Sequence, residues 1–365
     1  MTLLLAAVLL AAAQQQPQAS GRFAQISRQA LEAREQERWA DAERLYREGV
    51  KLRPEWKEGW WYLGTMSYDQ NRYEAARAAL RRFTILDPNV AAGWAFLGLC
   101  EYETKKYDDA QAHLEQALML RLNEDSQLSI VTRYHAVLLR IRSGQFEAAL
   151  AILMRFAEEQ NERPEFVEAA GLAALRKPLL PHELRSSDRE LVLEVGRAVM
   201  DTGARRAAKA QKDFEELIAA YPTAPNLHYL FGSFLLTSDP EAGLAELKKE
   251  LEISRQHAPT LVQIAFEYLK RGDPEAALQF ARKATAADPQ YFVAHCALGR
   301  VLMESGDIQA GIRELEICEQ QAPGEPQTHI ALASAYAKAG RNNDAARERT
   351  EFLKLKQLTK SPGEQ

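Results

Sequence analysis

The chain has 365 residues, of which 46% are hydrophobic and 27% are charged, values that are ordinary for a globular protein. Its net charge is −5, and its basic residues occur only in short clusters such as Arg81-Arg82 and Lys354-Leu355-Lys356. Nucleic acids and anionic membranes are bound by a concentrated positive field, so this pattern argues against both kinds of partner. The length predicts two or three domains unless one repeating architecture fills the chain.

Residues 1–22 are predicted to be a signal peptide with a short linker. The apolar run Leu3–Ala13 is too short to span a bilayer, which needs ~20 residues, but it matches the core of a secretory signal. Ala11-Ala12-Ala13 supplies small residues for cleavage, although no Lys or Arg precedes the run. We therefore expect an exported protein, periplasmic or secreted, with no integral membrane segment after processing. The alternative is a cytoplasmic protein with a frayed apolar N-terminus.

Residues 23–163 contain a repeating pattern. Small residues and prolines recur at one constant interval: Ala42, Ala76 and Ala110; Gly64 and Gly98; Pro54 and Pro88. A period of this length, about 34 positions, indicates a solenoid of stacked units. Within 57–90, the spacing of apolar residues predicts two helices separated by a turn at Asn71-Arg72. The second helix should end at Asp87-Pro88, because the residue before proline avoids the α-helical backbone conformation.

Residues 164–190 interrupt this pattern. Pro178 and Pro181 lie three residues apart and cannot both lie inside a helix. We therefore predict an irregular half-repeat with a proline-containing insertion and without a full second helix. Proteases should cut first within 177–190, because few backbone groups can be paired there.

The period resumes in residues 191–365, where Gly243, Ala277, Gly311 and Ala345 are separated by the same constant interval. The last helix, ending near Leu358, carries many charges and fits a solvent-facing cap before a short disordered tail.

One departure from the period falls in the first array, where Ala110 and Ala149 lie five residues too far apart. A first helix about one turn longer than the others is therefore expected within 126–143.

The repeated residues resemble the tetratricopeptide repeat (TPR) family. Residues 57–90 carry the family pattern most fully, with Trp60, Leu63, Gly64, Ala76, Leu80, Phe83 and Pro88. Further matches lie in residues 23–56, 91–124, 258–291, 292–325 and 326–359. The resemblance implies an all-α fold: a right-handed superhelical solenoid of antiparallel helix pairs, with about nine full repeats plus one irregular unit.

The three cysteines, Cys100, Cys296 and Cys318, cannot all pair within one chain, and no C-x-x-C motif occurs. We expect small buried residues in helices. A disulfide between Cys296 and Cys318 is the only specific alternative.

Catalytic and metal-binding signals are weak. The chain lacks a P-loop, a dinucleotide-binding motif, a metalloprotease motif and a nucleophile elbow, so we expect neither an enzyme nor a cofactor. A catalytic site could be built only in the insertion, from His182, Glu183 and Asp188.

Three histidines occupy equivalent places. His228, His295 and His329 fall at the fourth position of their repeats, where the family has a core-facing Trp. Equivalent positions in neighbouring repeats should stand ~10 Å apart, whereas zinc ligands lie ~2.0–2.1 Å from one ion, so no metal site is expected.

The resemblance also implies a binding groove, because fixed positions of each first helix line the concave surface of a TPR solenoid. Here these positions carry Trp61, Tyr68, Leu99, Tyr102, Asn226, Tyr229, Phe266, Lys270 and Arg300. Aromatic side chains and Arg are common anchors of recognition surfaces. The alternative for each side chain is packing between adjacent first helices. Since neighbouring residues on a helix point about 100° apart, we predict that Trp60 packs internally and that Trp61 faces the groove.

We therefore predict a non-catalytic interaction scaffold that binds a peptide or protein segment in this groove. The alternative is a cell-envelope assembly or secretion accessory factor acting on one defined complex. The sequence leaves the partner and the oligomeric state open.

Overall fold

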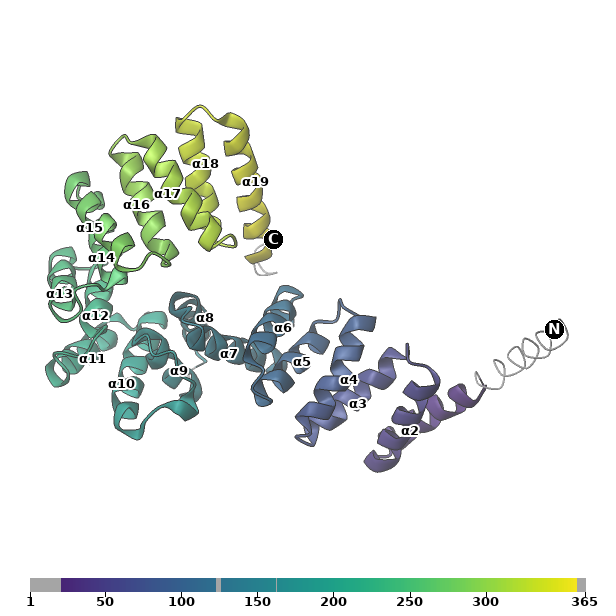
Figure 1. Ribbon diagram of the computed structural model, residues 1–365. Coiled ribbons are helices and arrows are strands. Elements are labelled where there is room, and N and C mark those ends of the chain that lie inside the picture. The colour runs from purple at the N-terminus through teal and green to yellow at the C-terminus, as the bar shows by residue number, and fades with distance from the viewer. Residues whose placement is uncertain (1–20, 123–125, 162, 360–365) are drawn as a thin grey trace. The chain divides into compact units, whose positions relative to one another are not determined.

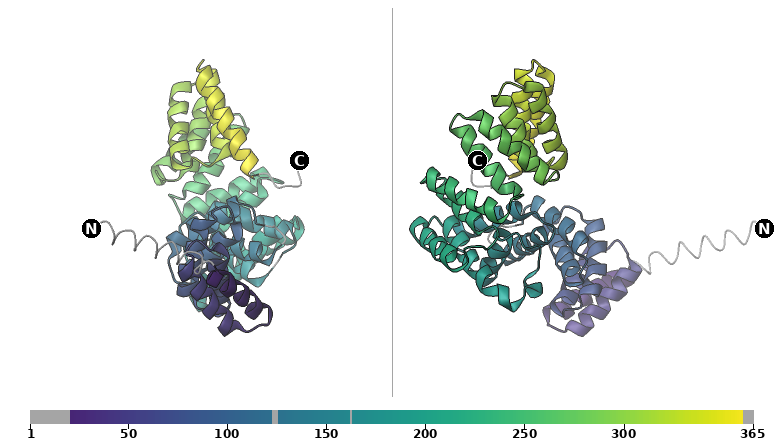
Figure 2. Two further views of the ribbon diagram at one scale, coloured as in Figure 1. Left: turned by 90° about the vertical axis from the view of Figure 1, so that its right-hand side faces the viewer. Right: turned by 60° about the vertical axis from the view of Figure 1, so that its left-hand side comes forward.

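A computed structural model describes residues 21–122, 126–161 and 163–359. Within these ranges the regular elements are helices and none is a strand, as the ribbons in Figures 1 and 2 show. Of the predicted signal peptide and linker, residues 1–22, the first 20 lie outside this part of the chain, and residues 21–35 form the first helix. None of the described helices combines the length and the apolar character needed to cross a membrane.

Contacts along the chain divide it between Ile152 and Leu153 into two compact units. After the helix at 21–35, unit 1 contains α2 (Trp39–Leu52), α3 (Lys57–Asp69), α4 (Tyr73–Leu86), α5 (Ala91–Glu103), α6 (Tyr107–Met119), α7 (Gln127–Arg142) and the beginning of α8 (Phe146–Glu158). Helix α3 packs against α4, and α5 packs against α6. Helix α7 has 16 residues where α3 and α5 have 13, which confirms the predicted extra turn.

Unit 2 contains the rest of α8 and the helices that follow it. These are α9 (Pro164–Ala174), the 3-10 helix η1 (Pro181–Glu183), α10 (Ser186–Gly203), α11 (Ala207–Ala220), α12 (Leu227–Leu235), α13 (Pro240–Ile253), α14 (Ala258–Lys270), α15 (Pro274–Ala287), α16 (Phe292–Glu304), α17 (Ile308–Gln321), α18 (Pro326–Lys338) and α19 (Asn342–Thr359). Consecutive helices pack in pairs, clearest for α16 with α17 and α18 with α19 in Figure 1. The predicted all-α solenoid of helix pairs is confirmed, whereas the predicted array boundaries stay predictions.

Small residues allow the two helices of a pair to approach closely. A Cβ atom on Gly64 would lie 2.6 Å from Cγ of Leu80, and one on Gly98 would lie 2.7 Å from Cγ of Leu114. Both leucines are fully buried. The repeated glycine therefore faces the repeated leucine of the second helix, and a larger residue there would force the helices apart.

The irregular segment differs from its prediction. Helix α10 begins directly after η1 and packs against α9 as well as α11, so α9 does have a full helical partner. The insertion is anchored, because Leu180 is fully buried and its N–H donates to the Glu183 carboxylate at 2.7 Å. The expectation that few backbone groups are paired within 177–190 is therefore wrong for the centre of this segment, whereas early proteolysis there stays a prediction.

Candidate functional site

In unit 1, the predicted groove residues of α3 make aromatic contacts with the next helices. The Trp61 ring lies 5.1 Å from the Phe83 ring and 5.8 Å from the Phe96 ring, measured between centroids. Tyr68 lies 5.0 Å from Phe96 and 5.7 Å from Tyr73. Burial raises the pKa of Tyr68 to about 12. Both side chains are half-buried, so they pack between helices and present only part of their surface to solvent.

The two predicted groove residues of α5 also pack against neighbouring helices. Leu99 is only 2% exposed and belongs to a core cluster with Leu114 and Leu139, so it cannot line an open groove. Tyr102 is half-buried, and its ring lies 4.7 Å from the His135 ring. Unit 1 therefore offers little free surface at the predicted positions.

Asn226 has a structural role at the start of α12. It precedes the helix, adopts a left-handed conformation with φ of 72°, and donates from Nδ2 to the Leu175 carbonyl at 3.2 Å. The buried Glu250 carboxylate accepts the N–H groups of Asn226 at 2.9 Å and Tyr229 at 3.3 Å. Burial raises the pKa of Glu250, and these two donors partly oppose the rise. Asn226 thus occupies the position before the first residue of α12, and its side chain bonds to Leu175, which corrects its predicted place on the helix face.

Four predicted residues remain. The Tyr229 ring is half-buried and lies 5.1 Å from the His257 ring, whereas the other three residues come together. Phe266, Lys270 and Arg300 line a hollow of about 690 Å³ on α14, α16 and α18. The Arg300 guanidinium carbon lies 5.2 Å from the centroid of the Phe266 ring, and both Lys270 and Arg300 are exposed. A volume of this size falls within the range of ligand-binding sites.

Three further polar side chains line the same hollow and were missed by the sequence reasoning: Glu304, Ser334 and Lys338. Glu304 and Lys338 form an ion pair at 3.7 Å. The repeat period could have located these residues. Ser334 follows Arg300 by one repeat period, and Lys338 follows Glu304 by the same interval. The hollow therefore presents three cations and one carboxylate that already has a partner.

The fourth position of the repeat has a consistent hydrogen bond in both units. Trp60 and Trp94 donate from Nε1 to the carbonyls of Pro54 and Pro88 in the preceding loops, at 2.8 and 2.7 Å. In unit 2, histidines replace tryptophan, and Nε2 of His228, His295 and His329 lies 3.0, 3.1 and 3.0 Å from the carbonyls of Pro222, Pro289 and Pro323. The other ring nitrogen, Nδ1, of each histidine contacts Glu246, Glu314 or Glu348 at 2.6, 2.7 or 2.8 Å.

Each of these histidines thus has its own two oxygen partners and none shares a partner with another. Among the residues that the structure describes, no group of three or more His, Cys, Asp or Glu side chains could hold a metal ion. In the insertion, Glu183 accepts a backbone hydrogen bond and Asp188 pairs with Arg185 at 3.0 Å, while His182 is exposed. These three residues do not form a common site.

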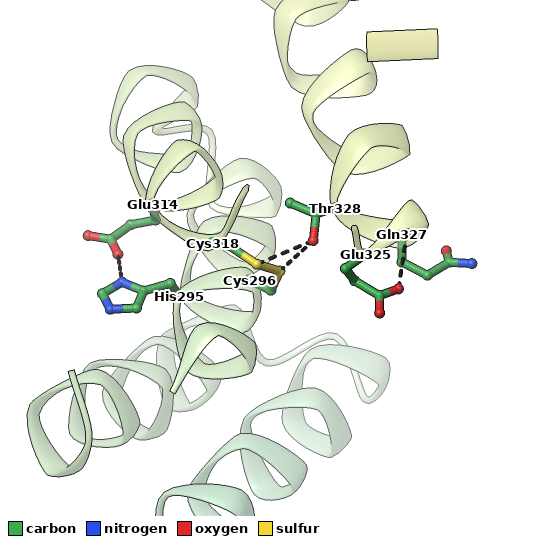
Figure 3. Close-up of a disulfide and its surroundings, with 7 residues drawn as sticks. All are labelled: His295, Cys296, Glu314, Cys318, Glu325, Gln327 and Thr328. Atoms are coloured by element: carbon green, nitrogen blue, oxygen red, sulfur yellow. Dashed lines mark hydrogen bonds and ion pairs between the residues drawn. A yellow bond between two sulfur atoms is a disulfide. The ribbon is translucent and has the colours of Figure 1, made fainter. Parts of the chain in front are cut away.

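Cys296 and Cys318 form a disulfide that joins α16 to α17, the specific alternative that the sequence left open. Figure 3 shows this bond beside the His295–Glu314 contact. The Thr328 hydroxyl of α18 lies 3.4 Å from both sulfur atoms. Cys100 is a free, fully buried thiol, as predicted, and burial raises its pKa to about 12.

Comparison with known proteins identifies the repeats. Tetratricopeptide-repeat family models match residues 27–91 and 66–126, and another matches residues 258–291. No curated protein matches the chain.

Two solved structures illustrate the similarity of fold. MamA (41-end) from Desulfovibrio magneticus RS-1 is 19% identical, with 46% of this chain and 96% of that chain covered and a TM-score of 0.40. The APC/C hetero-tetramer Cut9–Hcn1 is 11% identical, with 92% of this chain and 87% of that chain covered and a TM-score of 0.45. Since both scores are below 0.5, the assignment depends on the family models and on the helix pairs. Residues 27–126 and 258–291 of the chain are tetratricopeptide repeats.

Proposed function

We propose that this protein is a non-catalytic scaffold that binds a segment of a partner protein in the hollow on α14, α16 and α18. Tetratricopeptide repeats suggest a protein-interaction role, and one observation points to the place. Phe266, Lys270 and Arg300, three of the side chains predicted to line the groove, converge on that hollow. An aromatic ring beside an exposed guanidinium is a common composition of an interaction anchor.

The charges of the hollow favour an acidic segment. Glu304 is engaged by Lys338, and among the described residues no carboxylate lies within ion-pair distance of Lys270 or Arg300. Complementary charge sets orientation and association rate at protein interfaces. A partner segment carrying Asp or Glu beside an apolar side chain fits this arrangement.

The test is site-specific photo-crosslinking in cells. Benzoylphenylalanine at Ser334, an exposed residue of the hollow, should capture a partner, whereas the same group at the exposed Gln309 of α17 should not. Arg300→Glu should reduce capture from position 334 at least tenfold. Equal products from positions 334 and 309 would contradict the proposal.

The same experiment separates the scaffold from the alternative of an envelope-assembly or secretion factor. One stoichiometric complex captured at Ser334 favours the assembly factor, and a set of several unrelated partners favours a general scaffold. Both outcomes keep the hollow as the binding site.

We further propose that the protein is exported. The apolar run Leu3–Ala13 and the Cys296–Cys318 disulfide both support this location, since stable disulfides are rare in reducing cytosol. N-terminal sequencing of the protein isolated from cells should find a chain that begins at or near Gln14. An intact Met1 in a cytosolic fraction would contradict export.

A further inference from the structure

Unit 1 contains a second hollow, built from α2, α3 and α4 and separate from the predicted groove positions. Its volume is about 500 Å³. Apolar and small side chains line it: Val50, Trp60, Leu63, Ala75, Ala78 and Ala79. This is a size that accommodates one or two large side chains of a partner.

The hollow is bounded by a fixed aromatic ring and small neighbours. The Trp60 indole is held by its hydrogen bond to the Pro54 carbonyl and is half-buried, so part of the ring remains accessible. On α4, the exposed Ala75 and Ala78 leave space that larger residues would fill. A rigid aromatic wall reduces the side-chain entropy lost when a partner binds.

Three cationic side chains also line this hollow, and none of its lining residues is Asp or Glu. Arg47 is paired with Glu43 at 2.5 Å, and Glu43 also binds Arg72 at 2.7 Å. Lys51 and Arg82 are exposed, and within the described chain no carboxylate lies within ion-pair distance of either side chain. The hollow therefore carries uncompensated positive charge beside an apolar pocket.

A smaller hollow of about 330 Å³ continues this surface along α4. It shares Ala78 and Arg82 with the first hollow and ends at Ile85, whose side chain is 65% exposed. Its other two cations are already paired, Arg77 with Glu74 and Arg81 with Glu101. Together the hollows form a continuous strip in which Lys51 and Arg82 are the cations open to a partner.

We propose that this strip is a second protein-binding surface, which receives a partner segment with a Leu or aromatic side chain flanked by Asp or Glu. The apolar side chain enters the hollow beside Trp60, and the carboxylates pair with Lys51 and Arg82. The surface lies on residues other than the α14–α18 hollow and within the other unit, so it is independent of the function proposed above.

The test is selection of phage-displayed random heptapeptides on the full-length protein. Each selected clone is then measured on the wild type, on Lys51→Glu/Arg82→Glu and on the control Arg28→Glu/Lys105→Glu, which makes the same charge change at exposed residues outside the strip. We expect a class of clones that combine an apolar residue with flanking Asp or Glu. These should bind at least tenfold more weakly to Lys51→Glu/Arg82→Glu and unchanged to the control.

A steric variant separates pocket binding from general charge attraction. Ala78→Leu fills the hollow, keeps the charge and suits a helix, so it should weaken the same clones at least fivefold. The proposal is overturned if no clone depends on Lys51 and Arg82, if the dependent clones lack acidic residues, or if Ala78→Leu leaves their binding intact.

Discussion

His329 lies between two oxygen acceptors, the Pro323 carbonyl at Nε2 and the Glu348 carboxylate at Nδ1. A neutral imidazole can donate from only one nitrogen, so both contacts are hydrogen bonds only when the ring is protonated. Burial by itself lowers the pKa of His329, but the Pro323 carbonyl and Glu348 outweigh it, and the pKa is raised above its usual value. The folded state therefore binds this proton more tightly than the unfolded chain does.

The raised pKa of His329 determines how stability depends on pH. The stabilisation by protonated His329 is fully present below the unfolded pKa of about 6.5 and is lost as pH rises through the higher folded value. The free energy of unfolding of the wild type should therefore fall over this window relative to Glu348→Gln, which removes the charged acceptor. Urea unfolding at several pH values measures the difference. Glu351→Gln, the same change on the same helix, is the control and should run parallel to the wild type.

The outcome for the two adjacent tryptophans shows how far residue roles can be predicted from sequence. The repeat pattern predicted that Trp60 packs internally; its indole bonds to the Pro54 carbonyl and packs against the core, but the ring is half-buried and part of it lines the hollow on α2, α3 and α4. It predicted an open groove face for Trp61, but Phe83 and Phe96 pack against that ring. A consensus position states which face a residue occupies. It does not state how large the neighbouring side chain in the next repeat is. Here that neighbour is Phe96, whose ring covers part of Trp61.

The contact between α9 and α10 depends on two glycines. A Cβ atom on Gly171 would overlap the Val192 carbonyl oxygen, and one on Gly196 would overlap the Val167 carbonyl oxygen. Backbone groups cannot move aside as a side chain can. The two helices thus meet backbone to backbone, a closer approach than Gly64 makes to the Leu80 side chain in the regular repeats.

Gly171→Ala should therefore destabilise unit 2 by about 3 kcal/mol, toward the upper end of the usual cost of overpacking. Without this close approach the same change within a helix would stabilise by roughly 0.5–1 kcal/mol, so the sign of the effect is informative. Denaturant unfolding measures it. Gly324→Ala, at a glycine with no atom within 4 Å of a Cβ, is the control and should change stability by less than about 0.5 kcal/mol.

Helices that follow the repeat period could be predicted with their turns, and the longer α7 followed from the excess spacing. The α9–α10 pair could not, because the prolines of the insertion signalled only that a helix stops. Nothing periodic connects Gly171 with Gly196, whose separation is shorter than the repeat period. The chain reaches α10 through a short anchored segment in which Leu180 is buried, and this packing depends on tertiary neighbours that the local sequence does not reveal.

Across the whole molecule, each repeat contacts mainly its neighbours, so stability in a solenoid is approximately a sum of local terms. The Cys296–Cys318 disulfide joins α16 to α17, and Thr328 on α18 contacts its sulfur atoms. A covalent link within one repeat should therefore stabilise that repeat and the next one, and leave distant repeats unchanged.

Reduction should lower the free energy of opening of α16–α18 by about 3 kcal/mol, the value usual for closing a loop of this length. Hydrogen exchange with and without a reductant measures it residue by residue, and protection of α3–α6 should stay constant. Cys296→Ala/Cys318→Ala should reproduce the loss and make exchange insensitive to reductant. A loss of protection spread evenly over α3–α6 and α16–α18 would contradict local stabilisation.

The exchange of tryptophan for histidine at the fourth position also gives the two units different optical properties. The five tryptophans are Trp39, Trp56, Trp60, Trp61 and Trp94, and all belong to unit 1. Tryptophan fluorescence therefore reports on unit 1 alone, because unit 2 contains no tryptophan. Emission and far-ultraviolet circular dichroism recorded on one unlabelled sample thus distinguish the melting of one unit from the melting of the whole chain.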